Sequence, residues 1–225
     1  MWTRQKWHLL PTPMGKRREY VLNVSFTMKY FNFDNDEKKF SVQNWMFVTW
    51  KDERLKWDPE KFHGIKAVEM YSFKIWTPSF RLYNSANSND YDRLIYALCH
   101  VKNTGAILCV PRTTHDVWCN VHHTNWPYDV QECSLEFGAW TNRWDHLKLN
   151  ITSRGCTMLG AEYGAEWFIS DYKEVQDHNS ERQLKMTFVL EREATGLAAL
   201  VVYPALILSI FYCMIDAILL LIRLV

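Results

Sequence analysis

Two of the six cysteines have the spacing of a small disulfide loop. Cys119 and Cys133 enclose thirteen residues, and positions 126–129 within the loop read Trp-Pro-Tyr-Asp. Closing such a loop would stabilise the folded state by roughly 3 kcal/mol, because the bond removes conformational entropy from the unfolded chain. Disulfides belong mainly to oxidising compartments. The pair therefore predicts a domain that folds on the secretory side of a membrane.

A second cysteine pair lies symmetrically about a turn. Cys99 and Cys109 are each five residues from Thr104, at the centre of an Asn-Thr-Gly turn, so they would face each other across a hairpin. Cross-strand disulfides require demanding geometry, and buried thiols are common in cores. A second disulfide and two buried thiols are therefore both compatible with this spacing. Cys156 and Cys213 have no partner that the sequence reveals.

Two asparagines stand in glycosylation sequons, Asn23 in Asn-Val-Ser and Asn150 in Asn-Ile-Thr. Such triplets accept glycans in the secretory pathway. Both are predicted glycosylation sites, and they agree with the compartment that the cysteines indicate.

Other kinds of chemistry find little support in the sequence. The 26 basic and 25 acidic residues are spread along the chain, and no basic tract predicts a nucleic-acid partner. The sequence has no glycine-rich phosphate loop and no nucleophile elbow. His115, His122 and His123 lack the regular spacing of metal ligands. We expect neither an enzyme nor a metal or other cofactor.

Alternating apolar residues predict strands in most of the chain. In residues 21–33, Leu22, Val24, Phe26, Met28 and Tyr30 share one face, as in a half-buried strand. Residues 40–50 alternate in the same way, and Trp45 and Phe47 lie on the face away from the expected core. Further strands are expected near 65–70, 94–101, 106–110, 134–137, 147–151 and 184–192.

Short strands at this spacing, with 15% aromatic residues, favour an all-β sandwich. Trp50, Trp57 and Trp76 are expected to pack between its sheets. No convincing amphipathic helix precedes residue 194. The predicted fold class is therefore all-β up to that point.

The C-terminal part differs in composition. Residues 196–215 form twenty consecutive uncharged positions, which is long enough for a helix to cross a bilayer. We expect a β-domain over residues 1–193 and a transmembrane segment over 194–225. The chain ends inside another apolar stretch, and residues 1–20 have no apolar core of a signal peptide, so both ends look truncated.

Several ordered motifs resemble the extracellular domain of the Cys-loop ligand-gated ion channels, in the nicotinic acetylcholine receptor branch. The resemblance covers residues 21 to 215. Besides the disulfide loop, it rests on Asn44-Trp45, Trp50-Lys51-Asp52, residues 54–59, Gly64-Ile65, Ile75-Trp76-Thr77-Pro78, residues 82–86, residues 137–141, Glu166-Trp167, Arg192 and Pro204.

The resemblance implies a site for a small cation such as acetylcholine between two subunits. Aromatic rings suit this task, because their faces attract a quaternary ammonium that cannot donate hydrogen bonds. The implied principal side consists of Tyr83, Trp140 and Tyr172. The implied complementary side consists of Trp45, Phe47, Leu98, His100, Leu108 and Val110.

One departure from the family bears on the role of this chain. Residues 172–185 contain no cysteine and only Tyr172, whereas an agonist-binding principal subunit has an adjacent cysteine pair and flanking tyrosines there. The resemblance therefore implies a non-α type of subunit that contributes mainly a complementary face.

The resemblance also implies how a ligand signal reaches the membrane. Asp129 at the loop tip would pair with Arg192, just before the membrane segment, and Asp36 and Glu37 would share or compete for that arginine. The implied protein is a subunit of a pentameric cation channel in the postsynaptic plasma membrane, partnered by other receptor subunits. A membrane-tethered or shed β-sandwich binder without conduction, acting as a decoy or in adhesion, is the alternative.

Overall fold

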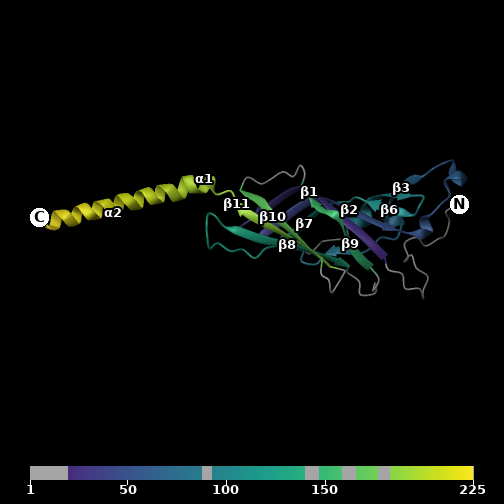
Figure 1. Ribbon diagram of the computed structural model, residues 1–225, viewed down its shortest axis with the longest axis horizontal. Helices are drawn as coiled ribbons and strands as arrows, with labels where there is room; N and C mark the ends of the chain where they lie inside the picture. The colour runs from purple at the N-terminus through teal and green to yellow at the C-terminus, as the bar shows by residue number, and fades with distance from the viewer. Residues whose placement is uncertain (1–19, 88–92, 140–146, 159–165, 177–182, 225) are drawn as a thin grey trace.

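Two β-sheets pack face to face, and one long helix extends from an end of this sandwich (Figure 1). The computed structural model describes residues 20–87, 93–139, 147–158, 166–176 and 183–224. The all-β fold with a C-terminal transmembrane helix, expected from the sequence, is confirmed.

The larger sheet has seven strands in the order β3-β5-β6-β2-β1-β9, with β7 also paired to β2. Among the described residues of this sheet, β1 and β9 run parallel and the other pairs are antiparallel. Both β6 and β7 pair with β2, each along a different part of it. The strands are β1 (Tyr20–Asp34), β2 (Lys39–Lys51), β3 (Ala67–Tyr71), β5 (Leu98–Lys102), β6 (Ala106–Cys109), β7 (Arg112–Trp118) and β9 (Leu147–Thr157).

The smaller sheet has four antiparallel strands in the order β10-β11-β8-β4. They are β10 (Trp167–Gln176), β11 (Gln183–Arg192), β8 (Val130–Ala139) and β4 (Phe80–Leu82). Four short 3-10 turns connect strands: η1 (Glu53–Leu55), η2 (Pro59–Phe62), η3 (Ser72–Lys74) and η4 (Arg93–Tyr96). The side chains of Asp52 and Asp58 cap the first two turns by accepting from backbone N–H groups, which satisfies otherwise unpaired donors.

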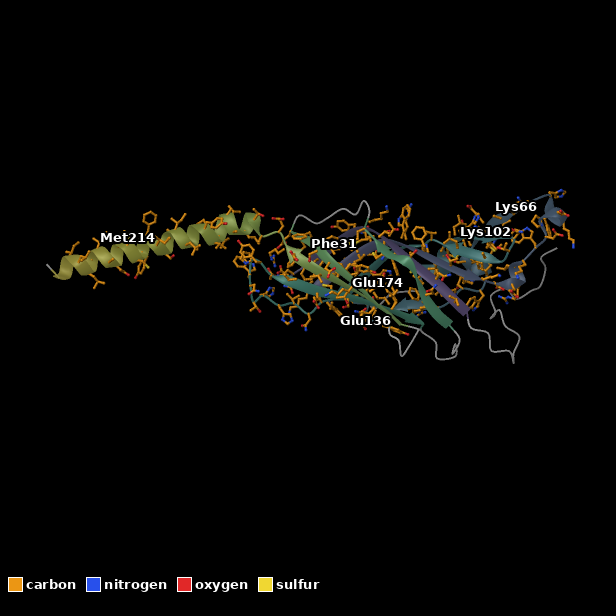
Figure 2. The ribbon with its side chains drawn as sticks, in the orientation of Figure 1. Phe31, Lys66, Lys102, Glu136, Glu174 and Met214 are labelled. Atoms are coloured by element: carbon orange, nitrogen blue, oxygen red, sulfur yellow. A yellow bond between two sulfur atoms is a disulfide. The ribbon has the colours of Figure 1, made fainter. Side chains whose placement is uncertain are left out.

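Aromatic side chains join the two sheets. The rings of Phe26 and Phe137 lie 5.1 Å apart, and those of Phe40 and Phe188 lie 5.5 Å apart. Each pair has one partner in each sheet, and aromatic pairs at such distances add to the gain from burial itself. Figure 2 shows Phe31 in the same interior.

Of the three tryptophans expected to pack between the sheets, two are buried in the core and the third lies at its edge. Trp50 and Trp76 are buried and meet edge to face at 6.4 Å. Trp57 is half-buried against the core, and its indole N–H donates to the carbonyl of Ile65 at 2.7 Å.

A β-bulge corrects the expected pattern of the first strand. The register with β2 shifts between Met28 and Tyr30, because one extra residue is accommodated there. Phe31 and Phe33 therefore take the buried positions, and Tyr30, which simple alternation placed on the core face, is only half-buried.

Three strands were missed from the sequence, and one expected strand is shorter. β4, β7 and β10 were not predicted, and residues 93–96 form η4 rather than the start of β5. β7 escapes a search for apolar alternation because its buried face includes Thr113 and His115. Thr113 is satisfied by donating to the amide oxygen of Asn44.

The helix after the sandwich is long and apolar enough to span a membrane over residues 195–222. It comprises α1 (Thr195–Leu197), a π-helical turn, η5 (Ala198–Val202), and α2 (Tyr203–Leu224). Its most apolar stretch is not covered by the rest of the described chain, as Figure 2 shows at Met214. Such exposed apolar surface is suited to lipid.

Two glycines with positive φ give a test of local packing. A Cβ at Gly105 (φ +80°) would lie 2.4 Å from the carbonyl oxygen of Asp52, whereas one at Gly64 (φ +77°) would meet open space. We predict that Gly64→Ala lowers the free energy of unfolding by about 1–2 kcal/mol, the cost of the left-handed backbone. Gly105→Ala should cost about 1–3 kcal/mol more, because of overpacking.

Urea titration of the full chain in detergent, followed by near-ultraviolet circular dichroism, measures both values. Equal losses for the two variants would contradict the close approach of Gly105 to Asp52.

Candidate functional site

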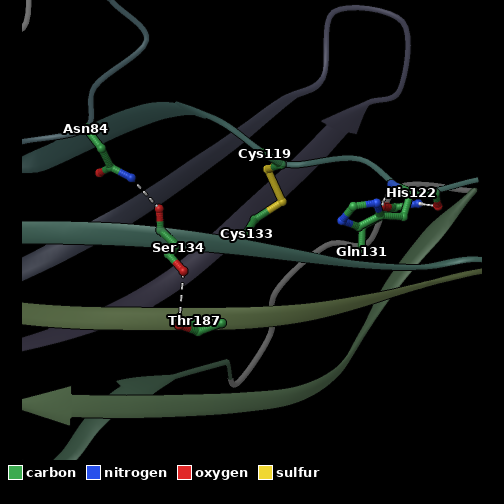
Figure 3. The surroundings of a disulfide bond; sticks show 7 residues. All are labelled: Asn84, Cys119, His122, Gln131, Cys133, Ser134 and Thr187. Atoms are coloured by element: carbon green, nitrogen blue, oxygen red, sulfur yellow. Dashed lines mark hydrogen bonds between the residues drawn. A yellow bond between two sulfur atoms is a disulfide. The ribbon is translucent and has the colours of Figure 1, made fainter.

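The disulfide between Cys119 and Cys133 is formed, as the sequence predicted. Cys119 follows the last residue of β7 in the larger sheet, and Cys133 lies within β8 of the smaller sheet. The bond therefore links the two sheets covalently, as Figure 3 shows. The loop that it closes lies at the end of the sandwich from which the helix departs (Figure 1).

Gln131 holds the closed loop in shape. Its side-chain oxygen accepts from the backbone N–H of His122 at 2.9 Å, and its amide nitrogen donates to the carbonyl of His122 at 2.7 Å (Figure 3). The same nitrogen donates to Asp129 at 3.0 Å. The glutamine is buried, so these bonds satisfy polar groups that would otherwise be costly to bury. Sequence reasoning did not identify this residue.

Asp129 and Arg192 form a buried bidentate ion pair. The Arg192 Nε donates to Oδ1 of Asp129 at 2.7 Å, and Nη2 donates to Oδ2 at 3.1 Å. The side chains are 4% and 1% exposed, for arginine and aspartate respectively, so solvent screens this pair little. The pair joins the disulfide loop to the last residue of β11, which lies three residues before the membrane helix begins.

Glu166 and Trp167 complete the surroundings of the arginine. The Glu166 carboxylate accepts from Nη1 of Arg192, and the guanidinium lies over the Trp167 ring at 4.2 Å. A guanidinium stacked on an indole gains cation–π attraction. The sequence motif Glu166-Trp167 was noted only as part of the family resemblance, and its contact with Arg192 depends on the pairing of β10 with β11.

The pair also shifts the pKa values of both partners. Burial alone would raise the pKa of Asp129, but hydrogen bonds from Arg192 and Gln131 outweigh burial and hold that pKa below its ordinary value. The hydrogen bond to Asp129 raises the pKa of Arg192. Both groups are therefore charged at neutral pH.

The turn at Asp36 and Glu37 does not share the arginine, contrary to expectation. The side chain of Asp34 caps this turn, accepting from the backbone N–H groups of both residues at 2.9 Å. Glu37 pairs instead with Lys39. Neither acid contacts Arg192 among the residues that the structure describes, and Glu166 takes the place that the sequence assigned to them.

The second cysteine pair is also a disulfide. Cys99 and Cys109 are opposite each other in the antiparallel pairing of β5 and β6, and both are completely buried. Of the two alternatives that the spacing left open, the structure has the covalent one. The bond fixes the register of this hairpin, so the residues on either side of each cysteine face outward together.

The six residues implied for the complementary side lie on one outer face of the larger sheet. His100 is opposite Leu108 across β5 and β6, and Leu108 is opposite Thr49 of β2. Trp45 lies further along the same strand and is 38% exposed. The whole set, Trp45, Phe47, Leu98, His100, Leu108 and Val110, is exposed or half-buried. Their role in binding remains a prediction.

The residues implied for the principal side are less completely described. Tyr83 follows β4, is 41% exposed, and lies so close to Gly138 that a Cβ there would be 2.2 Å from its ring. Trp140 lies outside the described residues. Tyr172 is half-buried, packs 5.1 Å from the Phe188 ring and donates its hydroxyl to Glu174. Burial and this bond raise the pKa of Tyr172.

The two sequon asparagines meet across the parallel strands β1 and β9. Asn23 and Asn150 are direct register partners, and Nδ2 of Asn150 donates to Oδ1 of Asn23 at 2.8 Å. Both side chains lie at the surface of the larger sheet.

The comparison with known families decides the assignment of this fold. The model of the neurotransmitter-gated ion-channel ligand binding domain matches residues 5–194. The chain belongs to this family. A neurotransmitter-gated ligand-binding domain is a receptor component and not an enzyme.

Individual relatives are acetylcholine receptor subunits. The chain is similar to the neuronal acetylcholine receptor subunit beta-2 of Carassius auratus, with 27% identity over 206 residues, covering 89% of this chain and 45% of the relative. It is also similar to the acetylcholine receptor subunit beta-type acr-3 of Caenorhabditis elegans, with 36% identity over 135 residues, covering 60% and 27%.

A third relative is the neuronal acetylcholine receptor subunit non-alpha-2 of Carassius auratus, with 27% identity over 198 residues, covering 84% of this chain and 43% of the relative. The chain thus spans less than half the length of these relatives.

The buried pair of the ligand-binding domain gives a prediction about stability and pH. Asp129→Asn removes the charge and leaves the guanidinium with a weaker partner, so the free energy of unfolding at pH 7 should fall by about 3 kcal/mol. Because the folded-state pKa of Asp129 is below its ordinary value, its contribution is present above about pH 4 and is lost as the pH falls through the folded-state value.

Urea unfolding between pH 7 and pH 2 should therefore show a steeper acid loss in the wild type than in Asp129→Asn. Glu37→Gln, which removes an exposed carboxylate of a surface pair, is the control and should have little effect. Parallel pH profiles for the wild type and Asp129→Asn would show that the pair does not contribute as described.

Proposed function

We propose that this chain is part of a subunit of an acetylcholine-type, neurotransmitter-gated cation channel. Residues 1–193 form its extracellular domain and residues 194–225 its membrane segment. It assembles with other receptor subunits into a pentamer in the postsynaptic plasma membrane. Membership of the ligand-binding family and the similarity to beta-type and non-alpha subunits support this function.

Within that receptor, the chain contributes mainly the complementary face of an agonist site. The observation that carries this proposal is the outward cluster on β2, β5 and β6, where an exposed tryptophan stands beside half-buried apolar side chains. Large exposed apolar side chains gathered on one face are typical of a contact surface. The absence of cysteine from residues 172–185 argues against a full principal face.

The route from this site to the membrane runs through the ion pair of Asp129 and Arg192. The Cys119–Cys133 disulfide connects the loop to the sheet that carries Trp45, and Arg192 is joined directly to the membrane helix. Movement of the complementary face relative to a neighbouring subunit is therefore transmitted to the helix through rigid connections.

Co-expression with an α-type acetylcholine receptor subunit tests this function. We expect both chains to co-purify as a pentamer that binds radiolabelled acetylcholine. Trp45→Ala should weaken binding by roughly tenfold, which corresponds to about 1.4 kcal/mol, because a cation–π contact is lost. Trp118→Ala, which removes another exposed tryptophan from the same sheet, is the matched control and should leave affinity unchanged.

A stable lone monomer that never co-purifies with receptor subunits would contradict the proposal and favour a separate binding module. Equal affinities for the Trp45 and Trp118 variants would exclude Trp45 from the agonist site.

A further inference from the structure

The tip of the disulfide loop presents large side chains that do not contribute to the core. Trp126, Tyr128 and Val130 are 46%, 60% and 49% exposed, respectively, although all three are largely apolar. Pro127 and Asp129, which alternate with them, are buried. Inward and outward side chains therefore alternate along the tip, and we call the outward set of Trp126, Tyr128 and Val130 the tip face.

Two hydrogen-bonded turns fix the backbone that carries the tip face. The N–H group of Trp126 donates to the carbonyl of His123 at 3.2 Å, and the N–H group of Tyr128 donates to the carbonyl of Asn125 at 2.7 Å. These turns lie within a loop that the disulfide closes. The exposed rings are thus held in a defined place on the domain.

The contact between Asp129 and Arg192 sets the level of the tip relative to the membrane helix. Besides the side-chain pair, the backbone N–H group of Arg192 donates to the carbonyl of Asp129 at 3.4 Å. The helix begins at Thr195, and three residues span at most about 11 Å. Figure 1 shows the loop reaching toward the start of the helix. The tip face consequently lies close to the level at which the chain enters the bilayer.

The charge of the loop suits a position at this level. Residues 120–131 contain one carboxylate, that of Asp129, and no lysine or arginine. Because Arg192 neutralises Asp129, a tip that approaches the bilayer does not bring an unpaired carboxylate with it. Tryptophan and tyrosine are enriched where water meets hydrocarbon. Their rings are apolar, and their N–H and O–H groups can still bond to headgroups and water.

We propose that the tip face is a second membrane contact of this chain, in which its rings lie among the lipid headgroups of the leaflet next to the β-domain. The partner is the lipid surface itself, because the apolar helix places the bilayer at the level of the tip. This contact attaches the disulfide loop to the membrane at a point separate from the helix. It involves only the loop and the helix of the same chain, so it does not depend on the agonist or on the partner subunits.

Fluorine nuclear magnetic resonance tests the contact on the full chain, labelled with fluorotryptophan and placed in phosphatidylcholine nanodiscs. A lipid whose headgroup carries chelated gadolinium speeds the relaxation of fluorine nuclei near the headgroups. Trp118 is the matched reference, because it is 67% exposed but precedes the disulfide on β7. The two signals are assigned by their loss in Trp126→Phe and Trp118→Phe.

The two tryptophans should differ because they lie at different heights. Cys133 is four residues after Asp129, or about 13 Å along an extended strand, and Trp118 is next to its disulfide partner Cys119. Paramagnetic relaxation falls steeply with distance, so this separation of about 13 Å should make the enhancement at Trp126 at least about fivefold larger than at Trp118. A smaller ratio would overturn the proposal.

A second comparison changes the tip face and keeps its reporter. The double variant Tyr128→Ser, Val130→Ser should lower the enhancement at Trp126 by at least about twofold, because apolar area that holds the tip in the lipid is lost. Phe62→Ser is the control, since it removes an exposed ring from η2, after the end of β2 that is far from the loop. No effect of the double variant, or an equal effect of the control, contradicts the proposal.

The same measurement after co-assembly with an α-type subunit separates lipid from protein as the occupant of the tip face. We expect the enhancement at Trp126 to persist in the assembled receptor. Its loss there would show that other membrane segments of the receptor cover the tip face, and would overturn the lipid assignment. Failure of co-assembly counts against the proposed function alone, because the result on the single chain still decides the lipid contact.

Discussion

The covalent link between the sheets is the constraint on which the other features depend. Cys119 continues from a strand of the larger sheet and Cys133 belongs to the smaller one, so the loop between them is held at both ends by different layers. That loop has a buried aspartate, and a buried carboxylate is tolerated only beside a suitable partner. By fixing the loop, the disulfide positions Asp129 beside Arg192 and leaves its side chain little conformational freedom.

The ion pair serves geometry more than net stability. Burying two charges costs most of what their attraction returns, and buried pairs can often be replaced by apolar side chains without loss. What the pair does provide is a unique docking of the loop on β11. The bidentate contact of Arg192 with Asp129 accepts only one orientation when Glu166 and the indole of Trp167 also contact the guanidinium. Such a contact suits a connection that has to be rigid.

Much of the fold could be predicted from local sequence patterns. Most of the incorrect predictions concerned features that depend on non-local contacts. Alternation was sufficient for β2 and for β1 up to Met28, and it placed Trp45 outward. It failed at the bulge beside Lys29 and at β7, whose buried face carries Thr113. The disulfide loop was readable from spacing alone. Gln131 and Glu166 were not readable in this way, because their residue types are ordinary at a surface. The contact of Glu166 with Arg192 also depends on the pairing of β10 with β11.

The connection between β11 and the membrane helix is short. Only two residues separate the end of the strand from the first helical residue, and one of them, Ala194, is buried. A two-residue connection cannot extend far enough to absorb a displacement of the sheet. A shift or rotation of the smaller sheet would therefore also displace the first turn of the helix.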